Sequence, residues 1–308
     1  MSDLARAVEL LRAACGPRLR ERVTVAPLTT FRLGGPAALY LEPESLDDLR
    51  AVARAVEESG LAVVVLGKGS NVLVSDAGVD GLVLRLGRGF RWAARDGTAL
   101  AAGGAMPLPA LAGIALTHAL AGLEFGIAIP ATLGGAVRMN AGAHGSSLAD
   151  VVERVDVFDL GSGTGRSVAP TEAGFRYRGS DLGEGAIVIG ARLRLEDGDP
   201  TAIRRRMDEA RSWRRETQPI AEPNCGSVFK NPEGDHAARL VEAAGCKGLA
   251  VGGARVSSKH ANFIVAGEGA RAADVLELIG AVQAAVLARS GVSLEPEVRL
   301  VGEFTARD

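Results

Sequence analysis

Residues 126–145 read GIAIPATLGGAVRMNAGAHG, and no other stretch of the chain says as much about its fold. Small residues stand at nearly every position, and Pro130 precedes the pair Gly134 and Gly135. Small side chains let a flat ring or a pyrophosphate approach the backbone closely, and leave N–H groups to bind it. A buried turn is the alternative interpretation. We favour a binding surface, because two such loops follow each other within twenty residues.

A second glycine-rich turn precedes this stretch. LGKGSN at residues 66–71 follows the apolar run 61–66, which is typical of a fully buried strand. Its glycines allow several N–H groups to converge on one point, an arrangement that suits a diphosphate. The turn lacks the G-K-[ST] of a P-loop, and no G-x-G-x-x-G opens a long helix, so the common nucleotide fingerprints are absent. An ordinary strand–turn–strand remains the alternative.

Composition excludes several classes of protein. The chain has 308 residues, 35 basic and 37 acidic, and its net charge of −2 argues against a broad nucleic-acid surface. Cys15, Cys225 and Cys246 are scattered without a CxxC pair, which favours free thiols in a reducing cytosol over disulfides or a metal site. No apolar run reaches the ~18 residues of a membrane span, and we expect no signal peptide.

Periodicity and capping signals predict an α+β chain. Ser45 and Asp48 resemble a capping box at the start of a helix that ends before Gly60, and a second helix, 272–290, ends at Gly291. Other helices are expected at 4–16, 108–120, 201–215 and 236–244, and strands at 37–42, 61–66, 72–75, 81–86, 90–96, 98–105, 154–159, 186–195 and 294–301. Composition shifts near 197–200, and the first part divides near residue 80.

Three short segments carry candidate chemical groups. In YRGSD, residues 177–181, Arg178 is suited to a bidentate clamp on a carboxylate, with a surface arginine as the alternative. In GSVFKNP, residues 226–232, Ser227 lies close to Lys230 and Asn231, a set that suits a polar substrate. In LEPEVR, residues 294–299, Glu295 and Glu297 fall on one side of a strand. We expect Glu295 on a solvated edge.

Read in order, these segments resemble one family, UDP-N-acetylenolpyruvoylglucosamine reductase. The resembling pieces span residues 29–302 and are TTFRLGGPA, LGKGSNVLVSD, IPATLGGAVRMNAGAHG, YRGSD, TQPIAEPNCGSVFKNP, AAGCKG, SSKHANFIV and LEPEVRLVG. No insertion separates Tyr177 from Gly226, so the chain is similar to the shorter subtype of that family.

The resemblance implies an α+β protein with a two-part FAD-binding module of the vanillyl-alcohol-oxidase type and a C-terminal α+β substrate domain. The expected division is 1–80 and 81–196 for the two FAD-binding subdomains and 197–308 for the substrate-binding domain. The implied FAD contacts are Gly67, Lys68, Gly69, Ser70, Asn71, Pro130, Ala131, Thr132, Gly134, Gly135, Ala136, Asn140, Ala141, Gly142 and Ala143. Ala131 replaces the usual glycine, which is tolerable only where its φ is negative. Cys225 stands where the family often has a small residue.

The reaction implied by the resemblance is NADPH-dependent reduction of UDP-N-acetylglucosamine enolpyruvate to UDP-N-acetylmuramate, a cytoplasmic step of peptidoglycan precursor synthesis. Hydride passes from flavin N5 to enolpyruvyl C3, and Ser227 protonates C2. Arg178 clamps the carboxylate, while Glu297 lies beside it and is expected to be protonated there. The implied substrate contacts are Tyr177, Gln218, Lys230 and Asn231. No metal, nucleic acid or membrane partner is expected, and a monomer is the default.

Three other functions are considered. An oxidase or dehydrogenase of hydroxy acids or sugars on the same module would react with oxygen, and a covalent flavin bond at His144 would mark it. A cysteine hydrolase would use Cys225 with His236 or His260, although no third orienting group is evident. A non-catalytic sugar-nucleotide binding module would bind without oxidising NADPH. The visible spectrum of the purified protein distinguishes the flavin-containing oxidase or dehydrogenase from the cysteine hydrolase.

Overall fold

The computed structural model describes residues 3–304, which form two compact units. Among these residues, unit 1 contains 3–21, 39–68 and 81–212, and unit 2 contains 22–38, 69–80 and 213–304. Each unit therefore combines segments that are distant in sequence. The expected three-part division at residues 80 and 196 stays a prediction.

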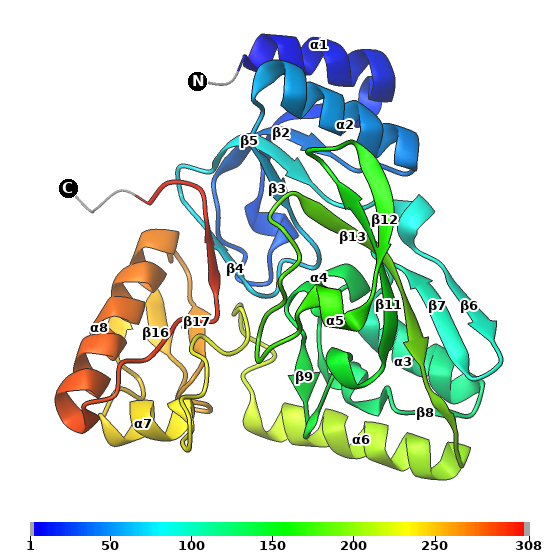
Figure 1. The fold of residues 1–308 in the computed structure, drawn as a ribbon. Helices are drawn as coiled ribbons and strands as arrows, with labels where there is room; N and C mark the ends of the chain where they lie inside the picture. Colours follow the sequence, from blue (N-terminus) through cyan, green and yellow to red (C-terminus); the bar gives the residue numbers. More distant parts are fainter. Residues whose placement is uncertain (1–2, 305–308) are drawn as a thin grey trace. The chain divides into compact units, whose positions relative to one another are not determined.

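Two helices cover a small sheet at the N-terminal end of the chain. The sheet has the order β1 (Arg20–Thr24), β2 (Pro36–Leu41), β5 (Val79–Leu84) and β3 (Val63–Val65). The helices α1 (Leu4–Cys15) and α2 (Leu46–Ser59) lie side by side (Figure 1). Their apolar faces pack with Leu39, Leu41, Leu82 and Leu84 in one buried cluster. The helices 4–16 and 45–59 that the sequence predicts are confirmed to within a residue or two.

The start of α2 is built from the predicted capping box. Ser45 Oγ accepts the N–H of Asp48 (3.1 Å), and the Asp48 carboxylate accepts the N–H of Ser45 (3.2 Å). Asp48 also receives two hydrogen bonds from the Arg18 guanidinium, at 2.5 and 2.7 Å. The hydrogen bonds from Arg18 hold the pKa of the Asp48 carboxyl below its ordinary value. Asp48 is therefore both a helix cap and the buried partner of an ion pair with Arg18, whose side chain is 38% exposed.

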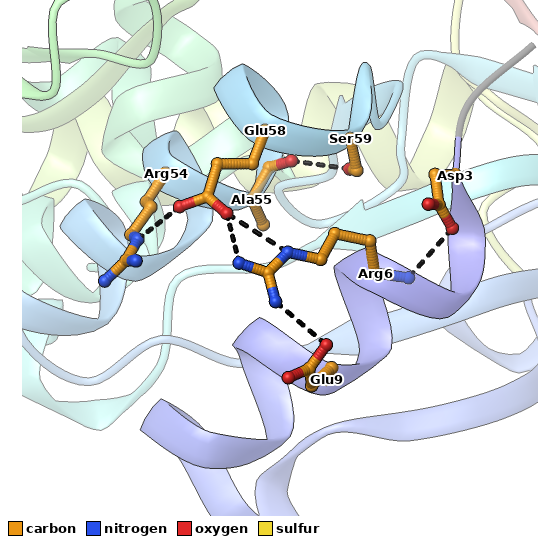
Figure 2. Close-up of polar contacts among 7 residues, drawn as sticks. All are labelled: Asp3, Arg6, Glu9, Arg54, Ala55, Glu58 and Ser59. Carbon is orange, nitrogen blue, oxygen red and sulfur yellow. Dashed lines mark hydrogen bonds and ion pairs between the residues drawn. The ribbon is translucent and has the colours of Figure 1, made fainter.

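The exposed side of the α1–α2 pair carries an ion-pair network (Figure 2). Arg6 contacts Glu58 and Glu9, and Arg54 donates to the other oxygen of Glu58. These groups are open to solvent, so salt screens them and they contribute little to stability. The buried apolar face is what holds the two helices together.

A five-stranded antiparallel sheet forms the centre of unit 1. Its order is β12 (Thr164–Val168), β11 (Val152–Asp159), β13 (Ala186–Arg194), β7 (Ala99–Gly103) and β6 (Ala93–Asp96). The largest buried cluster of the chain packs it against α3 (Leu108–Thr117), α4 (Leu133–Arg138) and the first turns of α6 (Pro200–Thr217). Smaller elements are α5 (Pro170–Ala173) and the pairs β8 (Leu120–Ala121) with β14 (Glu196–Asp197) and β9 (Gly142–Ala143) with β10 (Ser146–Ser147).

Unit 2 has its own core around a long helix. The helix α8 (Ala272–Ser290) buries Val275, Leu278 and Val282 and ends at Gly291, whose φ is +72°, as the sequence predicts. It packs on α7 (Ala237–Ala243) and on the antiparallel strands β15 (Ala250–Val251), β16 (Ala254–Val256) and β17 (Ile264–Ala266) (Figure 1). A parallel pair, β4 (Val72–Val74) with β18 (Arg299–Val301), joins segments from opposite ends of the sequence.

Several predicted boundaries are wrong. The strand expected over 294–301 is only β18, because Pro296 interrupts regular pairing. The strand expected over 81–86 begins earlier, at Val79, and the run 61–66 is extended only over Val63–Val65. The glycine-rich stretch contains the helix α4, which the sequence analysis did not predict, since glycine lowers helix propensity.

Candidate active site

The loop Gly67–Asn71 presents a row of unpaired backbone donors. Among residues 3–304, no group accepts a hydrogen bond from the N–H of Gly67, Lys68, Gly69, Ser70 or Asn71. Unpaired N–H groups are costly when buried, and Gly69 is buried. Five successive donors without a protein acceptor fit the oxygens of a diphosphate. The backbone of this loop therefore fits an FAD diphosphate, and its assignment as the phosphate site stays a prediction.

Gly69 explains why the loop needs glycine and what fixes it. Its φ is +67°, and a Cβ there would lie 2.3 Å from the carbonyl oxygen of Leu28. The Gly69 carbonyl accepts hydrogen bonds from the N–H (2.9 Å) and the hydroxyl (3.2 Å) of Thr30. The TTFRLGGPA segment, which says little by itself, thus anchors the middle of the loop.

The second predicted phosphate segment is organised differently. Thr132 caps α4, and a Cβ on Gly134 would lie 2.8 Å from the carbonyl oxygen of Val188, so this glycine permits close packing on β13. Ala131 is absent from the residues with positive φ, which meets the condition for an alanine there. The N–H of Ala131 donates to the carbonyl of Ile129 at 2.9 Å. This donor, which was expected to face FAD, therefore has an acceptor within the protein.

The expected flavin-lining segment begins with a buried asparagine. Asn140 is 8% exposed and has a φ of +41°. Its Nδ2 donates to the carbonyl of Arg176 (3.1 Å), and its Oδ1 accepts the N–H of Ala149 (2.9 Å). The side chain of Asn140 therefore has two structural partners, one at each end of its amide. Ala141, Gly142 and Ala143 are half-buried next to it, and the exposed His144 follows at the hairpin turn.

Arg178 lies in a tight turn that is fastened to α4. Arg176 and Gly179 exchange two backbone hydrogen bonds across the turn, and Arg178 has a φ of +55°. The Ser180 hydroxyl donates to the carbonyl of Arg138 at 2.8 Å, and Asn140 holds Arg176. The Arg178 guanidinium carbon lies 4.9 Å from the centre of the Tyr177 ring, a cation–π contact. A half-buried arginine on a strained turn is oriented, unlike a freely rotating surface arginine.

In unit 2, Ser227 and Glu297 lie on neighbouring backbone segments. Val228, which follows Ser227, accepts the N–H of Glu297 at 2.7 Å, and Lys230 donates its N–H to the carbonyl of Glu295 at 2.9 Å. The Ser227 hydroxyl has no hydrogen-bond partner within the described range. The structure thus brings together two of the three predicted catalytic residues within unit 2, while Arg178 belongs to unit 1.

The two acidic residues of LEPEVR have different surroundings. The side chain of Glu295 is 68% exposed and pairs with Lys230 Nζ at 2.5 Å, so the expectation of a solvated Glu295 is confirmed. Glu297 is half-buried. Its backbone carbonyl accepts a hydrogen bond from Asn71 Nδ2 at 3.1 Å. The side chain of Asn71, a predicted FAD contact, therefore binds the backbone of Glu297. The backbone N–H of Asn71 remains available for a phosphate.

The loop 217–232 is held by internal hydrogen bonds. Asn224 Nδ2 donates to the carbonyls of Pro219 (3.0 Å) and Glu222 (2.7 Å), and its Oδ1 accepts the N–H of Gly226 (2.9 Å). Gln218, a predicted substrate contact, accepts a hydrogen bond from Arg214 Nε at 3.1 Å. Asn231 Oδ1 accepts the N–H of Ala237 at the start of α7. The Asn231 side chain thus has a structural partner as well.

Two residues of interest were missed by the sequence analysis. Arg214 is half-buried in unit 2, and burial lowers the pKa of its guanidinium from the ordinary value. Asn262 is 4% exposed and bonds to the backbone of Phe229 through both ends of its amide. An asparagine within the apolar run ANFIV was the available signal, because a buried amide in such a run needs partners.

The geometry disfavours the cysteine hydrolase. Cys225 is buried, and burial with the nearby Glu297 charge raises the pKa of its thiol. Neither His236 nor His260 has a hydrogen bond to Cys225 Sγ within the described part of the chain. All three cysteines are free. In residues 3–304 no group of three or more His, Cys, Asp or Glu is arranged to hold a metal, and no helix is long and apolar enough to cross a bilayer.

Comparisons with known proteins agree with these observations. Residues 37–168 match the family model of an FAD binding domain, and residues 218–301 match that of the UDP-N-acetylenolpyruvoylglucosamine reductase C-terminal domain. The chain is 48% identical over 277 residues to the UDP-N-acetylenolpyruvoylglucosamine reductase of Heliobacterium modesticaldum, covering 89% of this chain and 88% of that protein.

Solved structures give the same result. The crystal structure of the UDP-N-acetylenolpyruvylglucosamine reductase from Thermus caldophilus matches with a TM-score of 0.81 and 39% identity, covering 92% of this chain and 99% of that one. A variant of Phl p 4, a glucose oxidase, matches at 14% identity with a TM-score of 0.51, over 63% of this chain and 44% of that one, a likeness of fold alone. The predicted fold, an FAD-binding module of the vanillyl-alcohol-oxidase type followed by a second domain, is confirmed. The chain belongs to the UDP-N-acetylenolpyruvoylglucosamine reductase family, and it is an FAD-dependent oxidoreductase.

Proposed function

We propose that this protein reduces UDP-N-acetylglucosamine enolpyruvate to UDP-N-acetylmuramate with electrons from NADPH, as a cytoplasmic and monomeric enzyme of peptidoglycan precursor synthesis. The observation that carries the proposal is the free Ser227 hydroxyl beside the backbone of Glu297, in a chain whose Gly67–Asn71 loop offers five unpaired donors. Residues 1–80 and 81–196 form the FAD-binding part, and residues 197–308 bind the sugar nucleotide.

FAD is expected to be held by its phosphates at the N–H groups of Gly67–Asn71. The segment from Pro130 to Ala136 contributes through Thr132, because the N–H groups of Ala131, Gly134 and Gly135 all have protein acceptors. Bound there, FAD would supply the redox chemistry, the transfer of hydride from NADPH to C3 of the enolpyruvyl group by way of N5. The protein supplies orientation and charge around that transfer.

Negative charge grows on the substrate as C3 receives hydride, and the protein's donors stabilise it. Arg178 clamps the carboxylate through a planar fork that is fixed by its turn. Glu297, as a neutral acid, donates a hydrogen bond to the same group, since two anions would repel there. Ser227 then delivers a proton to C2, and its lack of a protein partner leaves the hydroxyl available.

The nucleotide part of the substrate has four predicted contacts. Tyr177 is 53% exposed, so its ring offers a stacking face, with Arg178 on one side. Lys230 is held by Glu295, which fixes the position of its ammonium group. Gln218 and Asn231 present amides from the same loop. We expect these groups to bind the diphosphate and the rings by hydrogen bonding and stacking.

The test is the visible spectrum of the purified protein under anaerobic conditions. A yellow protein should be bleached by NADPH and should regain its colour when UDP-N-acetylglucosamine enolpyruvate is added in one equivalent. A yellow protein that a sugar or hydroxy acid bleaches and oxygen recolours, and whose reduced flavin the enolpyruvyl compound does not reoxidise, would identify the oxidase instead. A colourless protein that takes up no FAD contradicts the proposal, as does a yellow protein that NADPH fails to bleach.

A further inference from the structure

Asn262 lies in the turn between β16 and β17. No catalytic or binding role has been assigned to this segment. Its side chain is 4% exposed, which is unusual for an asparagine. A buried amide is costly unless its donors and acceptor are satisfied. The partners that satisfy it therefore indicate what the residue is for.

Those partners are the two residues after Ser227. Asn262 Oδ1 accepts the N–H of Phe229 at 2.9 Å, and Asn262 Nδ2 donates to the carbonyl of Phe229 at 2.8 Å. The backbone carbonyl of Asn262 accepts the N–H of Val228 at 2.9 Å. One residue thus binds three backbone groups of this segment, the N–H of Val228 and both the N–H and the carbonyl of Phe229.

Glu297 binds the same backbone segment. The carbonyl of Val228 accepts the N–H of Glu297 at 2.7 Å. Asn262 and Glu297 together hold both peptide groups that flank Val228. Since Ser227 precedes Val228 directly, these contacts fix the peptide plane that begins at the Ser227 Cα.

Asn262 is itself held in place. Its N–H donates to His260 Nδ1 at 3.2 Å, and Phe263 donates its N–H to the carbonyl of His260 at 3.0 Å. The His260 and Phe263 rings meet edge to face, with centroids 4.7 Å apart. The N–H of Ser257 closes the turn on the carbonyl of Phe263 at 2.8 Å. Asn262 therefore transmits the position of a rigid turn to the segment that carries Ser227.

We propose that Asn262 is a positioning residue for catalysis, holding the Ser227 hydroxyl and the Glu297 backbone in register for proton delivery to the substrate. The inference rests on the proposed function, because it assigns Asn262 a part in the half-reaction that uses Ser227. Positioning matters there, since a displacement of about 1 Å can cost on the order of 100-fold in rate. A packing role alone would not distinguish the two half-reactions.

The chemistry of the amide selects the variants. Asn262→Asp keeps the size and the acceptor but places a carboxylate oxygen opposite the Phe229 carbonyl, so the donor is lost and repulsion replaces it. Asn262→Ala loses both contacts. Asp274→Asn is the matched control, because Asp274 is a buried residue of unit 2 that accepts the N–H groups of Gly253 and Arg271, neither of which belongs to the segment that carries Ser227.

The experiment measures both half-reactions of each FAD-loaded variant by stopped-flow absorbance, together with FAD content and melting temperature. Flavin reduction by NADPH should stay within about 2-fold of wild type, while reoxidation by the enolpyruvyl substrate should slow by about 10- to 100-fold in both Asn262 variants. Asp274→Asn should lower the melting temperature and leave both rates unchanged. In a Ser227→Ala background, Asn262→Asp should cause little further loss, because both changes act on one step.

The outcomes that overturn the inference are distinct. Reoxidation at the wild-type rate in Asn262→Asp removes the positioning role. Equal slowing of both half-reactions with loss of FAD, or a full additional loss in the Ser227→Ala background, assigns Asn262 to general stability instead. If Asn262→Ala fails to fold, the Asn262→Asp variant and the double variant decide. A wild-type protein that the enolpyruvyl substrate cannot reoxidise overturns the proposed function first, and this inference with it.

Discussion

Asn71 and Glu297 are 226 positions apart in the sequence, and the side-chain amide of Asn71 donates a hydrogen bond to the backbone carbonyl of Glu297 at 3.1 Å. The Asn71 carbonyl in turn accepts the N–H of Arg299 at 3.1 Å, where β4 and β18 begin to pair. Asn71, a residue of the predicted FAD loop, thus fixes the segment that carries Glu297.

Replacing Asn71 by alanine should therefore disturb the position of Glu297 more than the binding of FAD. The N–H of residue 71 survives the change, so FAD should remain bound. Loss of the hydrogen bond to Glu297 should cost about 1 kcal/mol of unfolding free energy and slow flavin reoxidation by substrate. Stopped-flow absorbance and urea unfolding measure both effects. Gln283→Ala, which removes another amide-to-carbonyl bond in unit 2, is the control for stability. Loss of FAD with a normal reoxidation rate would contradict this account.

Ser227→Ala should separate the two half-reactions. Flavin reduction by NADPH should be nearly unchanged, and reoxidation by the enolpyruvyl substrate should fall by about 100- to 10,000-fold, the range for removing a general acid. Rapid mixing of the reduced variant with substrate gives the rate directly. Unimpaired reoxidation would show that another group supplies the proton.

Arg178→Lys should also impair only the second half-reaction. An ammonium group keeps the charge but cannot form the planar two-point contact with a carboxylate. Losing one charge-assisted hydrogen bond corresponds to about 1.5–3 kcal/mol, or roughly 10- to 100-fold in kcat/KM for the sugar nucleotide. Steady-state kinetics with each substrate varied in turn measures this. A variant with wild-type kcat/KM would place Arg178 outside the carboxylate site.

Asp48→Asn should destabilise the protein in a pH-dependent way. Asp48 caps α2 and pairs with Arg18, and its side chain is only 8% exposed, so the change should cost about 1–3 kcal/mol near neutral pH. The pKa of Asp48 is lowered in the fold, so its contribution is fully present above the ordinary aspartate value and is lost as pH falls through the folded value. Melting curves should therefore converge in acid. Asp47→Asn, at an exposed position of the same turn, should change little at any pH.

His260 should make the fold sensitive to mild acid. Burial and the nearby Lys247 lower the pKa of its imidazole, while Glu242 opposes the shift, and the neutral ring accepts the N–H of Asn262 through Nδ1. The unfolded chain then binds a proton before the folded one does, so this contribution is present above the ordinary value of about 6.5 and is lost as pH falls below it. Histidine titrates between about pH 7.5 and 5. In that window the melting temperature of His260→Gln should depend less on pH than that of wild type. The reference is His236→Gln, a change at an exposed histidine. If the melting temperature of His260→Gln depends on pH as strongly as that of wild type, His260 is not the acid-sensitive group.

The sequence by itself determined the features that depend on neighbouring residues. The capping box of Ser45 and Asp48, the left-handed Gly291 after α8, and the glycine loop Gly67–Asn71 all follow from local backbone chemistry, and each is found where it was expected. The order of the resembling segments was also sufficient to identify the family and its FAD module.

Only the tertiary structure decided which distant groups meet. The contacts of Asn71 with Glu297 and of Asn262 with Phe229 join residues that no periodic pattern relates, because a hydrogen bond between remote segments leaves no local signature. The same holds for Gly134, because the Val188 carbonyl packed against it leaves no room for a side chain. Local sequence fixes the shape of each turn, whereas the partners of its polar groups depend on how the whole chain packs.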